Sequence, residues 1–368
     1  MLTALALTLP AAGCGTAAGT QSPAAAPVSV PSPAPSLTLG GASAAAATSA
    51  VPPQPPTSPS AKAATSATAS PSAEASEAAE ESTTQAVARS DGRGGPVPFT
   101  PGKAMLGSYL ALGGKSLSQS LSLRRGQLDR EQRIVHRFYP WQGYIPTSEP
   151  DVSKKSVLLA SWHGAPLGGI NNGSSDANIR SVARKLKAMK RPILLRWGWE
   201  MNGDWFEWSG PKNGGPANYV KAYRRIHRIF GEVGADNIAW VWSPNWNSSP
   251  NSSANKVQKY YPGDDYVDWV GISGYNFYGE SPATLFNPIT KIYGGRKPII
   301  LTETAAVKGK AAWIKQLGAW VNKTSAVGAV VWFDTDVQHD SDHNFRFDTD
   351  SSALAAYRGM ARSSRFAG

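Results

Sequence analysis

Two glutamates in this sequence each follow an apolar run. Glu200 ends the segment LLRWGWE, and Glu303 lies in PIILTET. A pair of carboxyl groups is what the cleavage of a glycosidic bond requires, because one group handles the proton while the other attacks the anomeric carbon. A lone glutamate after a strand is often a helix cap or the partner of an arginine. Two of them in similar settings point instead to paired acid/base and nucleophilic chemistry.

The neighbours of the two glutamates suggest their roles. Aromatic rings desolvate a carboxyl group and so raise its pKa, which suits a general acid. Such rings surround Glu200 in the sequence, namely Trp197, Trp199 and Trp205. We therefore predict that Glu200 is the acid/base. Glu303 lies between two threonines, and the hydroxyl group of Tyr275 is a candidate to hold it ionised, so we predict that Glu303 is the nucleophile.

Short apolar runs alternate with helical patterns from residue 104 onward, and they must position these glutamates. Near-continuous apolar strands that alternate with helices indicate a parallel sheet covered on its outer face. Eight such runs predict an α/β fold with a single closed (β/α)₈ TIM barrel, and no G-x-G-x-x-G motif suggests a dinucleotide fold. The predicted strands are Ala104–Leu110, Arg133–Phe138, Ser156–Trp162, Ile193–Trp199, Ile238–Ser243, Trp269–Gly274, Ile299–Thr304 and Ala329–Phe333.

Active sites of such barrels lie at the carboxyl ends of the strands, which is where both glutamates fall. Aromatic and polar side chains at or beyond the same ends are candidates for substrate binding. The tryptophans among them could also be ordinary core residues, but we predict that they stack on sugar rings. This set comprises His163, Trp162, Trp199, Trp205, Trp208 and Trp332.

The segment WEMNGDW, together with Glu303 in LTET and Trp332 in VVWFD, resembles the family 26 glycoside hydrolases. The resemblance covers roughly residues 105–357 and implies a retaining enzyme of the large (β/α)₈ clan. It matches Glu200 to the acid/base and Glu303 to the nucleophile. It also implies that Tyr275, in GISGYNFYG, hydrogen-bonds the nucleophile. The remaining matched positions, which the resemblance places in the motif or near the cleavage point, are Asn202, Trp205 and Trp332.

One residue departs from the family pattern, which is commonly His-Glu-Met-Asn-Gly-x-Trp. The residue before Glu200 is Trp199, where many members have a histidine that contacts the sugar next to the cleavage point. The resemblance makes endo-β-1,4-mannanase the leading expectation for activity. Some members cut mixed-linkage β-glucan or β-1,3-xylan instead, and these stay open as alternatives with the same catalytic pair.

The first 97 residues differ in composition from the rest. Residues 1–14 end in AAGC after an apolar stretch, which resembles a signal peptide with the lipobox of bacterial lipoproteins. Cys14, the only cysteine, is the expected lipidation site. Residues 15–97 are rich in Ala, Ser, Pro and Thr, which predicts a disordered linker before a catalytic domain at 98–368. We therefore expect an extracellular, cell-surface lipoprotein, or a secreted protein if the leader is simply cleaved.

The formal net charge of +11 lies in the part after the linker, where the basic residues are scattered along helices. Such scattering is typical of solvated helix faces, and no nucleic-acid motif accompanies it, so we expect no nucleic-acid partner. The loop from Asp334 to His343 fits neither an EF-hand nor a zinc spacing, and we expect no metal or cofactor. The expected partners are a polysaccharide substrate and, through Cys14, a membrane. We expect a monomer.

Two hypotheses of other classes remain beside the enzyme. The barrel could be a non-catalytic carbohydrate-binding surface lipoprotein, although both glutamates are present. It could also be a structural cell-wall protein that uses its basic domain for anchoring.

Overall fold

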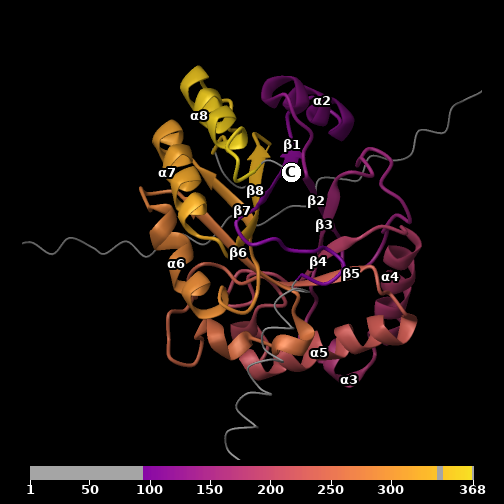
Figure 1. Cartoon of the computed structure of the whole chain (residues 1–368). Helices are drawn as coiled ribbons and strands as arrows, with labels where there is room; N and C mark the ends of the chain where they lie inside the picture. Colours follow the sequence, from indigo (N-terminus) through magenta and orange to yellow (C-terminus); the bar gives the residue numbers. More distant parts are fainter. Residues whose placement is uncertain (1–93, 338–342, 367–368) are drawn as a thin grey trace, which may run out of the picture.

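The computed structural model describes residues 94–337 and 343–366 (Figure 1). The predictions for the leader, for Cys14 and for nearly all of the linker fall outside these ranges. In the described part, eight parallel strands close into one barrel in chain order, so the predicted fold is confirmed. The strands are Met105–Ala111 (β1), Ile134–Tyr139 (β2), Val157–Trp162 (β3), Ile193–Trp197 (β4), Ile238–Trp242 (β5), Trp269–Asn276 (β6), Ile299–Ala306 (β7) and Val327–Thr335 (β8).

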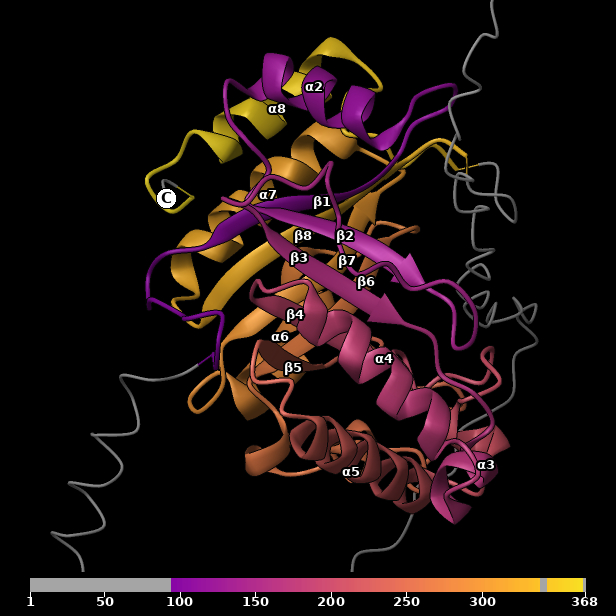
Figure 2. The same ribbon diagram turned by 90° about the vertical axis from the view of Figure 1, so that its right-hand side faces the viewer.

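Each predicted strand is present, and its ends agree with the prediction to within two residues. Helices form the outer layer around the barrel, as Figures 1 and 2 show. They are Leu117–Leu128 (α2), Leu167–Asn172 (α3), Asp176–Ala188 (α4), Pro216–Val233 (α5), Pro282–Tyr293 (α6), Lys310–Lys323 (α7) and Ser351–Ala361 (α8). In Figure 2 the arrows of β2 and β3 point to the same end of the barrel, where the loops after the strands gather.

The outer ring lacks a regular helix at two of the eight positions. The connection from β2 to β3 has no helix, and the connection from β5 to β6 has only two short 3₁₀ turns, Val257–Tyr260 (η3) and Asp264–Tyr266 (η4). The first of these gaps leaves the side of the barrel between α2 and α4 to a loop (Figure 1). The fold therefore departs from a regular (β/α)₈ barrel at these two connections.

The barrel interior holds a hydrophobic cluster of its own, distinct from the larger cluster between strands and helices. Strands β2 to β8 all contribute to it, which is possible only inside a closed sheet. Its buried members are Val97, Ile134, Leu159, Leu194, Ala239, Val241, Trp269, Ile300, Ala329 and Val331. Because strand side chains alternate, their neighbours along each strand face the helices.

The chain segment before β1 closes the end of the barrel opposite the carboxyl ends of the strands. Val97 is buried in the interior cluster, and the indole Nε1 of Trp269 donates to the carbonyl oxygens of Gly94 at 3.0 Å and Val97 at 3.1 Å. The folded domain therefore includes residues from Gly94 onward, four residues before the predicted boundary.

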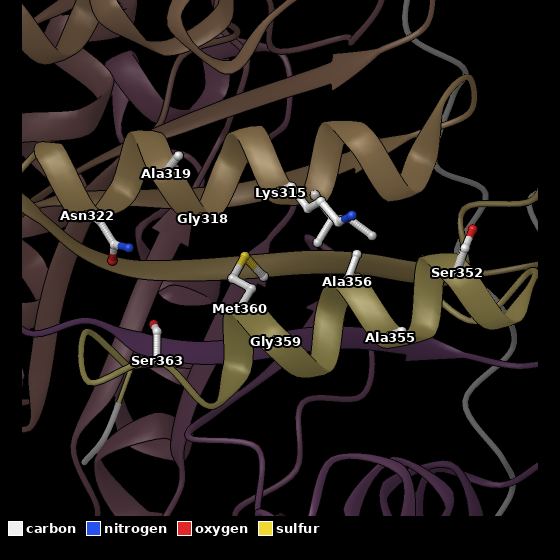
Figure 3. A pocket seen from close by; sticks show the side chains of 11 residues that line it. Lys315, Gly318, Ala319, Asn322, Ser352, Ala355, Ala356, Gly359, Met360 and Ser363 are labelled. Carbon is white, nitrogen blue, oxygen red and sulfur yellow. The ribbon is translucent and has the colours of Figure 1, made fainter.

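Helices α7 and α8 pack closely through small residues. A Cβ atom on Gly318 would lie 3.2 Å from Cγ of Met360, so the methionine side chain would have to shift slightly to admit it. A groove of about 560 Å³ runs between the two helices over these residues (Figure 3). It lies on the helix layer, and neither Glu200 nor Glu303 lines it.

Candidate active site

Glu200 lies on a tight turn just beyond the end of β4. Its backbone φ is +53°, in the left-handed region that non-glycine residues rarely adopt. Two hydrogen bonds hold this conformation, from Glu200 N to Ser243 O at 2.8 Å and from Gly203 N to Glu200 O at 2.9 Å. Strained backbone of this kind persists only where its surroundings fix it, and it concentrates at functional sites.

Glu303 reaches the barrel interior because β7 is irregular at this point. Ile300 belongs to the interior cluster, so strict alternation would turn Glu303 toward the helices. However, the register with β6 passes from Leu301 directly to Glu303 and leaves Thr302 without a partner. This extra residue re-aims the chain, as bulges near active sites commonly do. Glu303 therefore contacts Arg196 on β4 and Tyr275 on β6.

Glu303 is buried, with 3% of its surface exposed, and each carboxylate oxygen has a donor. Oε1 accepts from the guanidinium of Arg196, and Oε2 accepts from the hydroxyl group of Tyr275 at 2.5 Å. Burial, and then the charge of Glu303, raises the pKa of Tyr275 well above its usual value, so the phenol keeps the proton that it donates. Both donors fix the orientation of the carboxylate.

Glu200 has a different environment from Glu303. It is 6% exposed, and the indole Nε1 of Trp205 donates to its Oε2 at 2.9 Å. Burial, and then the negative charge of Glu303, raises the pKa of Glu200 to about 7, against the opposing charge of Arg196. The two carboxyl groups thus lie close enough to influence each other. One is poised to exchange a proton near neutral pH, and the other lies against a positive charge.

Arg196 connects the strands beneath the two glutamates. It is completely buried, and besides Glu303 it donates to three serine hydroxyl groups, which lie on β3, just after β5 and on β6. These are Ser161 at 3.3 Å, Ser243 at 2.9 Å and Ser273 at 2.6 Å. Each of the three guanidinium nitrogens thus has at least one hydrogen-bond partner, which is what keeps a buried charge tolerable in a core. Sequence reasoning missed Arg196, although a charge inside the apolar run ILLRWGW was a visible signal.

Of the tryptophans proposed to stack on sugars, Trp205 is the one that both contacts a glutamate and keeps part of its ring exposed. Trp199 and Trp208 lie at the same end of the barrel but are only 1% and 2% exposed. They pack in one aromatic cluster with Phe206 and His163, and the indole of Trp208 donates to the carbonyl oxygen of Trp199 at 2.8 Å. In this structure they support the wall of the site.

The positions of Trp162 and Trp332 argue against the prediction that these two side chains stack on sugar rings. They are 1% and 0% exposed, and their rings lie in the cluster between strands and helices, away from the barrel interior. Trp162 contacts Phe230 on α5, and Trp332 contacts Tyr357 on α8 and donates to Phe345 O at 2.8 Å. The cause is strand alternation, because the residues that face inward are Ser161 and Phe333. Neither tryptophan offers a ring face to a sugar.

Asn202 is also fully buried, and both atoms of its amide group have protein partners. Its Oδ1 accepts from Asn245 N at 2.8 Å, and its Nδ2 donates to Asn245 O at 3.0 Å and Asn247 O at 3.1 Å. These bonds tie the turn after Glu200 to the segment after β5. This geometry favours a positioning role for Asn202, whereas a direct contact with substrate stays a prediction.

His163 follows β3 and faces the aromatic cluster edge-on, with its ring 5.0 Å from that of Trp199. Burial lowers its pKa to about 4, so the imidazole is neutral near pH 7. Its Nε2 is buried without a hydrogen-bond partner in the described structure. A buried polar atom left unpaired is unusual, and it keeps His163 a candidate for a sugar hydroxyl group.

Three further aromatic residues line the inside of the barrel near the glutamates, and sequence reasoning missed them. Tyr109 on β1 stacks on Phe333 of β8, with ring centroids 4.8 Å apart and an angle of 17° between the rings. Phe333 in turn contacts Tyr275, and Phe138 on β2 contacts Trp199. Their inward positions follow from the alternation of side chains along each strand. The strands are apolar on both faces, so the sequence does not show which alternate set faces inward.

The described residues contain no group of three or more His, Cys, Asp or Glu side chains placed to hold a metal ion. Asp334, at the end of β8, has the guanidinium of Arg124 at 2.7 Å as its partner. The histidine at position 339, considered with it in the sequence, lies outside the described residues. Within residues 94–337 and 343–366, no helix has both the length and the apolar character needed to cross a membrane.

A closed parallel barrel with two buried carboxyl groups at the carboxyl ends of β4 and β7 defines the structural class of many glycosidases. The model of the family described as glycosyl hydrolase family 26 matches residues 168–357, about half of the chain. The chain therefore belongs to glycoside hydrolase family 26, and this confirms the family resemblance read from the sequence.

Several curated proteins are similar to parts of the chain. "Endoglucanase H" of Acetivibrio thermocellus is 31% identical over 251 residues, which is 62% of this chain and 27% of that protein. "Beta-1,3-xylanase TXYA" of a Vibrio species is 36% identical over 106 residues, 28% of this chain and 21% of that protein. A mannan endo-1,4-beta-mannosidase of Bacillus subtilis is 34% identical over 109 residues, 27% of this chain and 29% of that protein. The matches thus span only about a quarter of these relatives.

Solved structures share the fold. A family 26 β-mannanase from Bacteroides ovatus superposes with a TM-score of 0.53 at 16% identity, covering 72% of this chain and 90% of that one. A modular endo-β-1,4-mannanase from Cellulomonas fimi gives a TM-score of 0.55 at 17% identity, covering 72% of each chain. At these identities the likeness concerns the fold alone.

Proposed function

We propose that this protein is a retaining, endo-acting β-glycosidase in which Glu200 is the acid/base and Glu303 is the nucleophile. The observation that carries the proposal is the unequal environment of two buried carboxyl groups that lie close enough to influence each other. The pKa of Glu200 is raised to about 7, whereas Glu303 lies against Arg196 and Tyr275. Paired titratable groups in contrasting environments are the usual basis for dividing acid and nucleophile roles.

In the first step of this mechanism, a carboxylate oxygen of Glu303 attacks the anomeric carbon and forms a glycosyl ester. The bond from that carbon to the glycosidic oxygen breaks, and Glu200 gives its proton to the leaving oxygen. The indole of Trp205 holds Oε2 of Glu200 and so fixes the plane of the acid. Tyr275 and Arg196 hold the attacking carboxylate in place.

In the second step, Glu200 is a carboxylate and takes a proton from water while the water oxygen attacks the anomeric carbon. The ester bond to Glu303 breaks and both glutamates return to their starting states. Two inversions leave the sugar with its original β configuration. This course needs the two carboxyl groups about 5–5.5 Å apart, with the second acting directly as nucleophile.

The proposed substrate is a β-1,4-mannan, since several curated relatives are named mannan endo-1,4-beta-mannosidases. A second candidate is a β-glucan, because a relative that matches over 251 residues is named an endoglucanase. The structure adds one observation that weakens the case for the mannan. Trp199 replaces the histidine of the family motif and is buried in an aromatic cluster, so it cannot supply the hydrogen bond of an imidazole.

The test is the release of reducing ends by the purified protein from galactomannan, glucomannan, mixed-linkage β-glucan and β-1,3-xylan. Proton NMR of the first product then reads its anomeric configuration. We expect cleavage of one polymer, a β product, and no measurable cleavage by Glu303→Ala. Adding azide to Glu303→Ala should restore turnover of an activated aryl glycoside as the α-glycosyl azide. An α product from the wild type would refute retention.

A non-catalytic binding protein predicts a different pattern. It would release no reducing ends from any of these polymers, and its affinity would be the same with and without Glu303→Ala. Affinity electrophoresis of the two proteins in the same polymers distinguishes this rival from an enzyme that simply needs another substrate.

The location of the protein outside the cell is a further part of the proposal, and it rests on the sequence of the leader. We propose that Cys14 carries the lipid anchor. In a bacterial host fed labelled palmitate, the wild-type chain should become labelled and Cys14→Ser should not. A labelled Cys14→Ser protein would contradict this assignment.

A further inference from the structure

Tyr278 is an exposed aromatic residue just beyond the carboxyl end of β6. It exposes 63% of its surface, and among the described large hydrophobic residues Tyr144 alone, at 76%, exposes more. Both lie at the end of the barrel that holds the two glutamates, Tyr144 after β2 and Tyr278 after β6. Single exposed aromatic residues are common on proteins, so exposure by itself means little.

The turn that carries Tyr278 is fixed at several points. Gly279 N donates to Oδ1 of Asn276 at 2.7 Å, and Tyr278 N donates to Oε2 of Glu280 at 2.9 Å. The carbonyl oxygen of Glu280 accepts from the indole of Trp313 on α7 at 2.8 Å. Gly279 has a φ of +111°, which favours glycine at that position. The structure therefore holds this exposed ring on an anchored turn.

A row of aromatic rings leads from the proposed nucleophile to Tyr278. Tyr275, which donates to Glu303, stacks on Phe277 with ring centroids 5.5 Å apart and 29° between the planes. The ring of Phe277 is 6.3 Å from that of Tyr278, at 54°. The row thus begins at the reacting carboxylate and ends in solvent. Tyr144 has no ring contact in the described structure, and so no comparable connection to the site.

We propose that Tyr278 is a stacking platform for a sugar ring of the polysaccharide. This sugar is not one of the two that flank the cleaved bond but lies further along the chain. This inference rests on the proposed glycosidase function and deepens it. The axial C–H groups of a pyranose form an apolar face, and that face fits an aromatic ring that is 63% exposed. Burying both surfaces contributes to binding only for chains long enough to reach from Glu303 to Tyr278.

The experiment compares the wild type with Tyr278→Ala, Tyr278→Phe and Tyr144→Ala. Values of kcat/KM are measured on β-1,4-linked manno-oligosaccharides and on mixed-linkage gluco-oligosaccharides of three to six sugars. For the series that is cleaved, the ratio of kcat/KM for the hexasaccharide to that for the trisaccharide should fall about threefold to tenfold in Tyr278→Ala. Tyr278→Phe keeps the ring and should keep the ratio, as should Tyr144→Ala.

Three results would overturn the inference. They are an unchanged ratio in Tyr278→Ala, an equal loss in Tyr278→Phe, and the same loss in Tyr144→Ala. If the wild type cleaves none of the oligosaccharides, the two proposed substrates fail, and calorimetric titration with the two hexasaccharides then tests Tyr278 alone. Weaker binding by Tyr278→Ala than by Tyr144→Ala would support the platform, and equal binding would exclude it.

Discussion

Tyr275 and Glu303 are joined by a 2.5 Å hydrogen bond that runs from a phenol on β6 to a carboxylate on β7. The same carboxylate accepts from Arg196 on β4, so three strands converge on one functional group. Glu200, the other carboxyl group, instead has an indole as its donor and a pKa raised to about 7. This asymmetry generates specific expectations for pH dependence, stability and mutation.

The first prediction concerns the alkaline limb of the pH profile. Glu200 must carry its proton in the first step, and its raised pKa keeps that proton up to about pH 7. Hence kcat/KM should fall above pH 7, by about tenfold per pH unit. The hydrogen bond from Trp205 lowers the pKa of Glu200, so Trp205→Phe should move this limb to higher pH and reduce kcat/KM about fivefold. A limb that moves to lower pH would contradict this assignment.

The second prediction concerns stability. The folded-state pKa of Glu200 is raised above its unfolded value, so the protonated form is the one that the fold favours. Stability is therefore lost as the pH rises toward 7, because the buried carboxyl group must ionise. Glu200→Gln removes that loss and should stabilise the protein at pH 8 by up to about 3 kcal/mol, with little change at pH 4. Chemical denaturation at both pH values measures the difference, and an equal effect at both would refute the ionisation.

The third prediction concerns Arg196. Its charge contacts Glu303 and also lowers the pKa of Glu200, so its loss affects both steps. Arg196→Lys keeps a charge but cannot reproduce four directed hydrogen bonds, and we expect kcat to fall about 100-fold. The alkaline limb should move to higher pH in Arg196→Met. Circular dichroism identifies variants that fail to fold, and a folded variant with wild-type kcat would show that Arg196 only supports the barrel.

The fourth prediction separates two tryptophans that sequence reasoning grouped together. Trp332 is fully buried against α7 and α8, so Trp332→Ala should lower the free energy of unfolding by about 3–5 kcal/mol. The milder Trp332→Phe should leave KM for polysaccharide unchanged. Trp205→Phe should show the reverse pattern, with lower activity and nearly wild-type stability. A raised KM in Trp332→Phe would return this ring to the substrate site.

Most of the architecture was predictable from the sequence because its signals are local. A run of β-branched and aromatic residues identifies a strand whatever lies around it, and eight such runs separated by helical patterns leave few folds besides a barrel. The positions of Glu200 and Glu303 just past two of these runs likewise placed both at one end of the molecule. The missing helices after β2 and β5 were not predicted, because the connecting segments carry no sharp periodic signal.

The sequence by itself determined which residues form each strand and which end of the barrel carries the chemistry. The tertiary structure alone decided which side chains face inward. Ile300 faces the interior, so regular alternation along β7 would point Glu303 toward the helices. Glu303 faces the interior because Thr302 has no partner residue in the register between β7 and β6. The same rule, without a bulge, turns Trp332 outward and Phe333 inward. Register depends on the partner strands, which lie far away in the chain, so no local pattern records it.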